Sequence, residues 1–211
     1  MQLTYPQAIT HFKGRLRRSR YVFCVDLEAT CDDFIPGAEA SRRKLSIQKE
    51  EMEIIEVGVI ALDRLSNLST AAEFSRLVRP TTHPTLTRFC TSLTGIKQLD
   101  VDGAMTFSKV NQELNDFIEP YLIEGAVWCS WGRYDADQLK QDSTRLDITS
   151  LLTGLEHLSI DEFYSCAFGT PAPSLKEATE SMGMAWRGSY HRATDDARNL
   201  ARLLATLLDA R

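Results

Sequence analysis

The chain of 211 residues contains no apolar run that approaches the length of a membrane span. It also contains no internal repeat and no low-complexity linker. A hydrophobic content of 43% over this length is enough for one sizeable core. These features predict one domain over residues 20–211, preceded by a basic N-terminal arm over residues 1–19, and no membrane partner.

The cysteines follow no recognisable pattern. The five cysteines include no C-x-x-C spacing, and their odd number does not fit a framework of disulfides. Cys24 and Cys129 lie inside apolar, strand-like runs, where a thiol behaves as a small hydrophobic side chain. This usage predicts a reducing compartment, taken as the cytoplasm, and no structural zinc.

An overall excess of positive charge is missing as well. The formal net charge of −5 argues against a protein held to polyanions by bulk charge. Basic residues are concentrated at the start, because five lie between Lys13 and Arg20 and no acid precedes Asp26. Two interpretations stay open for this segment, an arm that contacts phosphate and a solvated basic stretch. An organelle transit peptide is less favoured, because the core motif begins at once.

The most informative segment is the apolar run Tyr21–Val25 with the acids that follow it. Side chains alternate along a strand, so Asp26 and Glu28 project from the same face. Two neighbouring carboxylates at the edge of a core repel each other and lose hydration, which is costly unless a cation lies between them. Oxygen ligands favour Mg²⁺ or Mn²⁺ over zinc. The segment therefore predicts a divalent metal site.

Two more segments offer acids at the ends of predicted elements. Asp135 follows the strand-like run Ala126–Trp131, and Asp196 lies at the start of a helical segment, five residues after His191. We expect these elements to converge at one end of a sheet. Four carboxylates and one histidine suffice for phosphoryl chemistry, in which a histidine that titrates near neutrality takes the proton of the attacking water.

Helical phase separates these acids from their neighbours. Leucines follow Asp196 at the positions four, seven and eight residues later, so Asp196 is expected to face the core. Polar residues, among them Asn199, follow Asp195 at the matching positions, which predicts a solvent-facing side. The same argument selects Asp135 over Asp137.

These motifs resemble those of a known family. Asp26 and Glu28, then Asp135, then His191 with Asp196, are similar to the three motifs of the DEDDh, or DnaQ-like, 3′-to-5′ exonucleases. The resemblance covers roughly residues 20–208. It narrows to the Eri-like exoribonuclease branch through the segments Glu53–Ile60, Leu77–Pro80 and Phe89–Ile96.

The resemblance implies an α/β fold of the ribonuclease H-like kind. Such a fold has a mixed central sheet, with an antiparallel meander followed by parallel strands, flanked by helices. The sequence pattern agrees, because strand-like runs near 21–28, 52–63 and 74–79 precede alternating strands and helices. Helices are expected at 107–121, at 160–168 and at 190–209.

The resemblance also implies a reaction and the residues that perform it. The chain is expected to hydrolyse RNA from its 3′ end into nucleoside 5′-monophosphates with two Mg²⁺ ions per site, for which Mn²⁺ can substitute. Glu28 and His191 are the expected catalytic residues, with His191 as the general base. The metal ligands implied are Asp26, Glu28, Asp135 and Asp196. The substrate contacts implied are Glu28, Ala29, Thr30, Leu93, Ile96 and His191.

Several alternatives stay open. A DNA-directed exonuclease of the same fold shares every catalytic residue, and a catalytically silent RNA-binding regulator is a second rival. A haloacid-dehalogenase-type phosphatase is disfavoured, because Glu28 is too long for its general acid and His191 has no task there. Arg192 and Arg198 are read either as phosphate contacts or as part of a solvated helix face. The polar stretch 31–50 is either a substrate contact or an ordinary loop. The oligomeric state is not predicted.

Overall fold

A computed structural model describes residues 5–16, 19–33 and 45–209 of the chain. Most of the polar stretch 31–50 therefore lies outside the described residues, including its basic knot at 42–44. Arg17 and Arg18 of the N-terminal arm lie outside them too. In the part that is described, no helix is long and apolar enough to cross a membrane.

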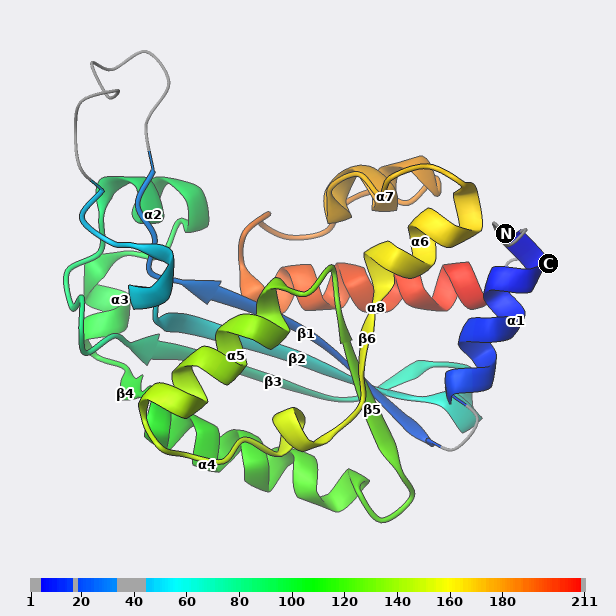
Figure 1. Cartoon of the computed structure of the whole chain (residues 1–211), viewed down its shortest axis with the longest axis horizontal. Coiled ribbons are helices and arrows are strands. Elements are labelled where there is room, and N and C mark those ends of the chain that lie inside the picture. The colour runs from blue at the N-terminus through cyan, green and yellow to red at the C-terminus, as the bar shows by residue number, and fades with distance from the viewer. Residues whose placement is uncertain (1–4, 17–18, 34–44, 210–211) are drawn as a thin grey trace.

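The core of the fold is a mixed six-stranded sheet in the order β4-β3-β2-β1-β5-β6 (Figure 1). The strands β1 (Tyr21–Ala29), β2 (Ile54–Asp63) and β3 (Ser69–Arg79) form an antiparallel meander. Next to β1, the strands β5 (Ala126–Ser130) and β6 (His157–Ser159) run parallel to it. The edge strand β4 (Met105–Thr106) runs parallel to β3. The predicted fold class is confirmed.

Helices cover both faces of the sheet (Figure 1). One face of β1, which includes Val22 and Cys24, packs under the helices α1 (Tyr5–Leu16), α6 (Ile160–Phe168), α7 (Leu175–Ser181) and α8 (Ala193–Asp209). The other face, which includes Phe23 and Val25, packs against α4 (Phe107–Ile118) and α5 (Tyr134–Arg145). Two short helices, α2 (Arg88–Thr94) and α3 (Gln98–Asp102), lie near the carboxyl end of β1.

Local sequence signals explain several element ends. Ser174 accepts the N–H of Glu177, whose side chain accepts the N–H of Ser174, and this capping box starts α7. Gly169 adopts a φ of 71° and ends α6, as its position after the helix predicts. Strand β2 shows no alternation of buried and exposed side chains, because all of its residues are buried. It has no solvent face because it is a central strand with helices on both sides.

Helix α1 packs on the sheet at the end of β1 that is remote from Asp26 (Figure 1). Phe12 and Leu16 of α1 belong to the buried core, and Phe12 stacks on Phe163 with ring centroids 4.4 Å apart. Arg15 and Arg20 bind carboxylates of the domain, at 2.8 Å from Glu156 and 2.8 Å from Asp63. These two arginines therefore support the fold at the far end of the sheet and are not placed to contact a phosphate near Asp26.

Candidate active site

Asp135 reaches β1 because β1 and β5 separate. The last pair in their parallel register is Cys24 with Cys129. Beyond it, the backbone N–H of Leu27 donates to Oδ1 of Asp135 at 2.8 Å, where a neighbouring strand would otherwise have paired. Asp135 lies in the first turn of α5, directly after β5, and is 4% exposed. Diverging carboxyl ends of parallel strands form a crevice, and this one is lined by acids.

The start of α8 rests on β2 beside the two acids of β1. Gly58 lies opposite Asp26 in the antiparallel register, so both residues share one face of the sheet. A Cβ atom at Gly58 would lie 2.3 Å from the backbone carbonyl carbon of Ala193, which only glycine avoids. The first turn of α8, which contains Asp196, is therefore pressed onto the face from which Asp26 and Glu28 project.

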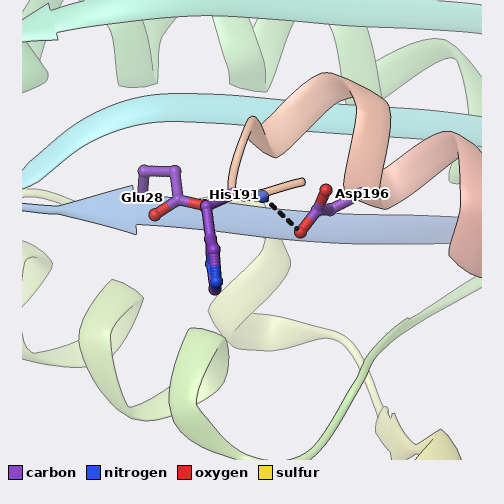
Figure 2. A group of neighbouring side chains, drawn as sticks. All are labelled: Glu28, His191 and Asp196. Carbon is purple, nitrogen blue, oxygen red and sulfur yellow. Dashed lines mark hydrogen bonds and ion pairs between the residues drawn. The ribbon is translucent and has the colours of Figure 1, made fainter. Parts of the chain in front are cut away.

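An acidic cleft results from these two approaches. Glu28, His191 and Asp196 each offer a ligand atom within 4.8 Å of the others (Figure 2). The Nδ1 atom of His191 lies 4.0 Å from Oε1 of Glu28. Asp26 and Asp135 line the same cleft, whose volume is about 360 Å³. The structure thus brings together the four acids and the histidine that the sequence singled out.

Burial and mutual repulsion disfavour the charged forms of these acids. For Asp26, burial and then the charges of Asp135 and Asp196 raise the pKa well above its ordinary value. Burial raises the pKa of Glu28 to about 9, and the charges of Asp196 and Glu56 add to this. Burial raises the pKa of Asp135 to about 7 and that of Asp196 to about 7. Such a cluster is stable as anions only when positive charge lies among them.

Asp196 shows that the site suits a cation. Its Oδ2 atom accepts the backbone N–H of His191 at 3.3 Å. Its Oδ1 atom is buried and finds no hydrogen-bond partner among the described residues. A buried carboxylate oxygen without a donor is costly, and a metal ion satisfies it. Because the other groups are mostly carboxylates, the residues present fit Mg²⁺ or Mn²⁺.

Without metal, the protein should lose stability as the pH rises. The acids bind protons more tightly in the folded protein, where the pKa of Asp135 and of Asp196 is about 7, than in the unfolded chain, where an aspartate titrates near 3.9. The folded state therefore holds more protons between these values, and its stability falls with pH across this window. We expect the Tm in EDTA to fall between about pH 5 and about pH 8.

Two additions sharpen this test. Mg²⁺ should restore the Tm at the upper end of the range, because the cations replace the lost protons. Asp196→Asn should flatten the decline in EDTA. A Tm in EDTA that stays constant or rises over the range would contradict the clustering of these acids.

The turn that presents His191 is held by side chains of α8. His191 has a φ of 62°, in the left-handed region. The backbone N–H of Ser189 donates to Oδ2 of Asp195 at 2.9 Å. Asn199 binds both backbone groups of Arg187, at 3.2 and 2.7 Å, and is fully buried. The predicted solvent-facing side at Asn199 is therefore wrong, because the segment before α8 folds back over it.

The implied nucleotide contacts divide into two groups. Ala29 and Leu93 line the cleft, as do Glu28 and His191. Thr30 is fully buried behind it, and its hydroxyl accepts the backbone N–H of Glu53 at 2.9 Å. Ile96 is fully buried in a small hydrophobic cluster. This burial corrects the expectation for the side chains of Thr30 and Ile96, which pack in the interior behind the cleft.

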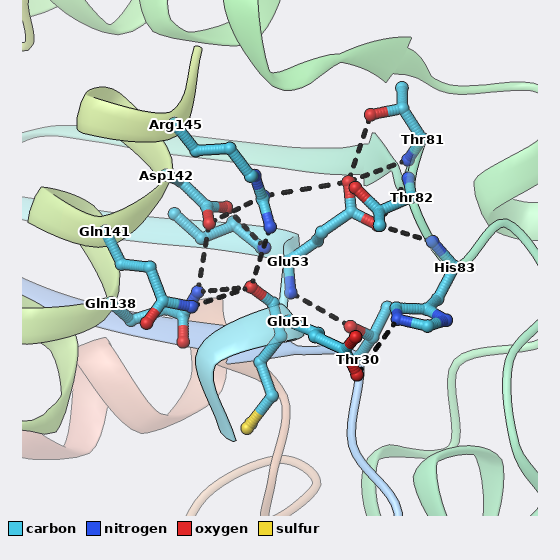
Figure 3. A network of polar contacts seen from close by, with 12 residues as sticks. Thr30, Glu51, Glu53, Thr81, Thr82, His83, Gln138, Gln141, Asp142 and Arg145 are labelled. Atoms are coloured by element: carbon cyan, nitrogen blue, oxygen red, sulfur yellow. Dashed lines mark hydrogen bonds and ion pairs between the residues drawn. The ribbon is translucent and has the colours of Figure 1, made fainter. Parts of the chain in front are cut away.

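A polar network behind the cleft fixes the direction of α5 (Figure 3). Asp142 is fully buried and accepts the backbone N–H of Ile54 at 2.7 Å. The carbonyl of Met52, a residue that lines the cleft, accepts side-chain donors of α5 at 3.0, 3.0 and 3.2 Å, from Gln138, Gln141 and Arg145. Because Asp135 is in the first turn of this helix, the network holds that acid in place.

Sequence reasoning missed the aromatic lining of the cleft. Phe89, Trp131, Tyr134 and Tyr190 contribute to its walls. The ring of Tyr190 lies 4.0 Å from that of His191, centroid to centroid. The available signal was sequence proximity, since Trp131 and Tyr134 come just before Asp135 and Tyr190 comes just before His191.

A mixed sheet of this order, with an acidic cleft and a histidine at the carboxyl end of β1, has the architecture of the ribonuclease H-like nuclease domains among the solved structures. The exonuclease family model RNase_T matches residues 23–204. The chain belongs to this family, and within it to the DEDDh 3′-5′ exoribonucleases of the Eri branch. The resemblance seen in the sequence motifs is confirmed.

The relatives share most of this chain. The 3′-5′ exonuclease eri1 of Schizosaccharomyces pombe is 32% identical over 213 residues, which cover 88% of this chain and 67% of the relative. ERI1 exoribonuclease 3 of Homo sapiens is 27% identical over 199 residues, covering 90% of this chain and 54% of the relative. The chain thus spans about half the length of the human protein.

Solved structures of similar proteins share the fold of this chain. The nuclease domain of 3′hExo, a DEDDh family member bound to rAMP, superposes with a TM-score of 0.77 at 26% identity, covering 91% of this chain and 93% of that one. A 3′-exonuclease solved for its 3′-end specific recognition of the histone mRNA stem-loop gives a TM-score of 0.76 at 26% identity, covering 90% and 82%.

Proposed function

We propose that this chain hydrolyses RNA from free 3′ ends, one nucleotide at a time, and releases nucleoside 5′-monophosphates. The observation that carries the proposal is the convergence of four acids and a histidine, from β1, α5, α8 and the turn before α8, on one cleft. The similar nuclease domain bound to rAMP supports a nucleoside monophosphate as the product.

The acids are assigned to two cation sites. Asp26, Glu28 and Asp196 are proposed to hold one divalent ion beside the attacking water, and Asp26 with Asp135 to hold a second near the leaving 3′ oxygen. When bound, the two Mg²⁺ or Mn²⁺ ions supply the activation of water and the stabilisation of charge on the leaving oxygen. The chain contributes a fixed geometry, because Asp135 is bound to the backbone of Leu27 and Asp196 to that of His191.

His191 is proposed to take the proton of the water at its imidazole. Burial lowers the pKa of His191 below its ordinary value, so the ring is neutral near pH 7 and can accept a proton. The ring is oriented by its contact with Tyr190 and by the hydrogen bond from its own backbone to Asp196.

The walls of the cleft suit the end of a single strand. Phe89 and Leu93 offer an apolar surface to the terminal base, and Trp131 and Tyr190 offer aromatic faces. Stacking on such faces tolerates every base, so the cleft is proposed to accept any 3′-terminal nucleotide. The cysteine pattern supports a reducing compartment, the cytoplasm, as the place of action.

A product assay tests this function. End-labelled single-stranded RNA with a free 3′ hydroxyl should yield nucleoside 5′-monophosphates in Mg²⁺ and no product in EDTA, while the same RNA circularised should remain intact. A DNA oligomer of matched sequence should react more slowly. Equal or faster degradation of the DNA would favour the DNA-directed alternative, and product from circular RNA would contradict an exonuclease.

A further inference from the structure

Glu56 is a buried acid beside the active site that the proposed mechanism does not use. It is 2% exposed and lies opposite Glu28 in the register of β1 and β2. Its charge helps to raise the pKa of Asp26, of Glu28 and of Asp196. A fifth carboxylate in this position adds to the repulsion among the others, so it needs a positive partner.

Arg192 is that partner. Its Nε atom lies 3.0 Å from Oε2 of Glu56, and its Nη2 atom lies 2.9 Å from Oε1, which is a bidentate pair. The backbone N–H of Ala193 donates to Oε2 as well, at 3.0 Å. Arg192 directly follows His191 in the chain, and Ala193 is the first residue of α8. The pair therefore attaches the junction between the histidine and the helix to β2.

The pair and Gly58 hold this junction at two neighbouring points of one strand face. Glu56 and Gly58 are two residues apart on β2 and lie opposite Glu28 and Asp26. Gly58 admits the backbone of Ala193 at close range, and Glu56 binds it. The acids of β1 and the start of α8 are the two parts of the active site. The same short stretch of β2 therefore holds both of them in place.

The pair also sets the net charge that the bound cations have to neutralise. When cations bind, the five carboxylates in and beside the cleft are ionised and carry five negative charges, and the guanidinium of Arg192 cancels one of them. The four that remain are the charge that two divalent cations neutralise. The guanidinium of Arg192 is thus already paired with a buried carboxylate of the protein, that of Glu56.

We propose that Arg192 and Glu56 form a positioning pair. It holds His191 and Asp196 over the acids of β1 and keeps the charge of the site at the value that two divalent cations match. The inference rests on the proposed function of the site. It assigns Arg192 a role other than the phosphate contact that the sequence left open. Arg198 serves as a contrast, because its pairs with Glu73 and Asp195 are exposed, at 2.7 and 3.2 Å.

The test compares Arg192→Met, Glu56→Gln, the double variant and, as a matched control, Arg198→Met. Arg192→Met should lower kcat on RNA by about 10- to 100-fold with KM within about two-fold of wild type, because misplacement of catalytic groups acts on the chemical step. Arg198→Met should change neither by more than about two-fold, since exposed ion pairs contribute little.

Binding of Mn²⁺ alone, measured by calorimetry, provides a readout that does not need activity. Glu56→Gln leaves the charge of Arg192 uncompensated beside the site, so its Mn²⁺ affinity should fall by about tenfold. The double variant removes both charges and should regain the wild-type affinity within about two-fold, and part of kcat. If Arg192→Met does not fold, the Mn²⁺ affinities of Glu56→Gln and of the double variant still test whether the pair acts on the site.

Two results would contradict the proposed positioning role of the pair. A raised KM with unchanged kcat in Arg192→Met, not rescued by Glu56→Gln, would make Arg192 a phosphate contact. Mn²⁺ affinities equal to wild type in every variant would show that the pair does not act on the site. Failure of the proposed function is a separate result, since it would appear as wild-type protein that leaves RNA intact in Mg²⁺ and would not alter the pattern of Mn²⁺ affinities.

Discussion

Asp196→Asn should abolish exonuclease activity and leave a folded protein. The substitution removes a charged ligand from the cleft while keeping the shape of the side chain, and the loss of several kcal/mol of transition-state stabilisation corresponds to a rate reduced on the order of 10³-fold or more. In EDTA at about pH 8, the variant should melt above wild type, because one of the mutually repelling carboxylates is gone. Initial rates on single-stranded RNA and thermal melting measure the two effects.

Asp137→Asn provides the matched control for a buried acid at a helix start. Asp137 lies in the first turn of α5 but is exposed, unlike Asp135 and Asp196. Its amide variant should keep wild-type activity within about two-fold. Ordinary Mg²⁺-dependent activity in Asp196→Asn would remove that residue from the metal site.

His191→Ala should lower kcat by about 10²- to 10⁴-fold, the usual contribution of a general base. The pH profile separates this role from a structural one. Burial lowers the pKa of His191, so wild-type activity should persist below pH 6.5 and then decline as the ring gains a proton. With Mg²⁺ kept saturating at every pH, so that the carboxylates stay ionised, the variant should lose this acid limb, because no imidazole remains to be protonated.

His11→Ala is a suitable control, since His11 is exposed on α1 at the other end of the sheet. It should show the wild-type profile. The same acid limb in His191→Ala and in wild type, or a wild-type rate that stays flat through the acid titration, would argue that another group takes the proton.

Elements with strong local signals could be predicted from the sequence. The apolar run that becomes β1 and the capping box at Ser174 act within a few residues, so pattern and cap chemistry suffice. Strands β4 and β6 were missed. They contain two and three residues, and they exist because a longer neighbour offers its backbone groups.

The residues of the site likewise divide into those that a local pattern predicts and those that depend on long-range contacts. The five residues to which we assign a chemical task could be named from the sequence, because acids in an apolar context need a reason to be there. Thr30 lies just past the end of β1, and its burial depends on the hydrogen bond that its hydroxyl accepts from the backbone N–H of Glu53, 23 positions away, which no local pattern encodes. The pair of Glu56 and Arg192 depends on a contact across 136 positions of sequence, which no local pattern encodes.

Asp26, Glu28, Asp135 and Asp196 are proposed to hold the divalent cations together. Anomalous diffraction at the manganese edge, from crystals grown with Mn²⁺ and a nucleoside 5′-monophosphate, locates such ions. We expect two manganese peaks about 3.5–4 Å apart among the four carboxylates. Carboxylates that stand apart from one another, with no manganese peak between them, would contradict the proposal.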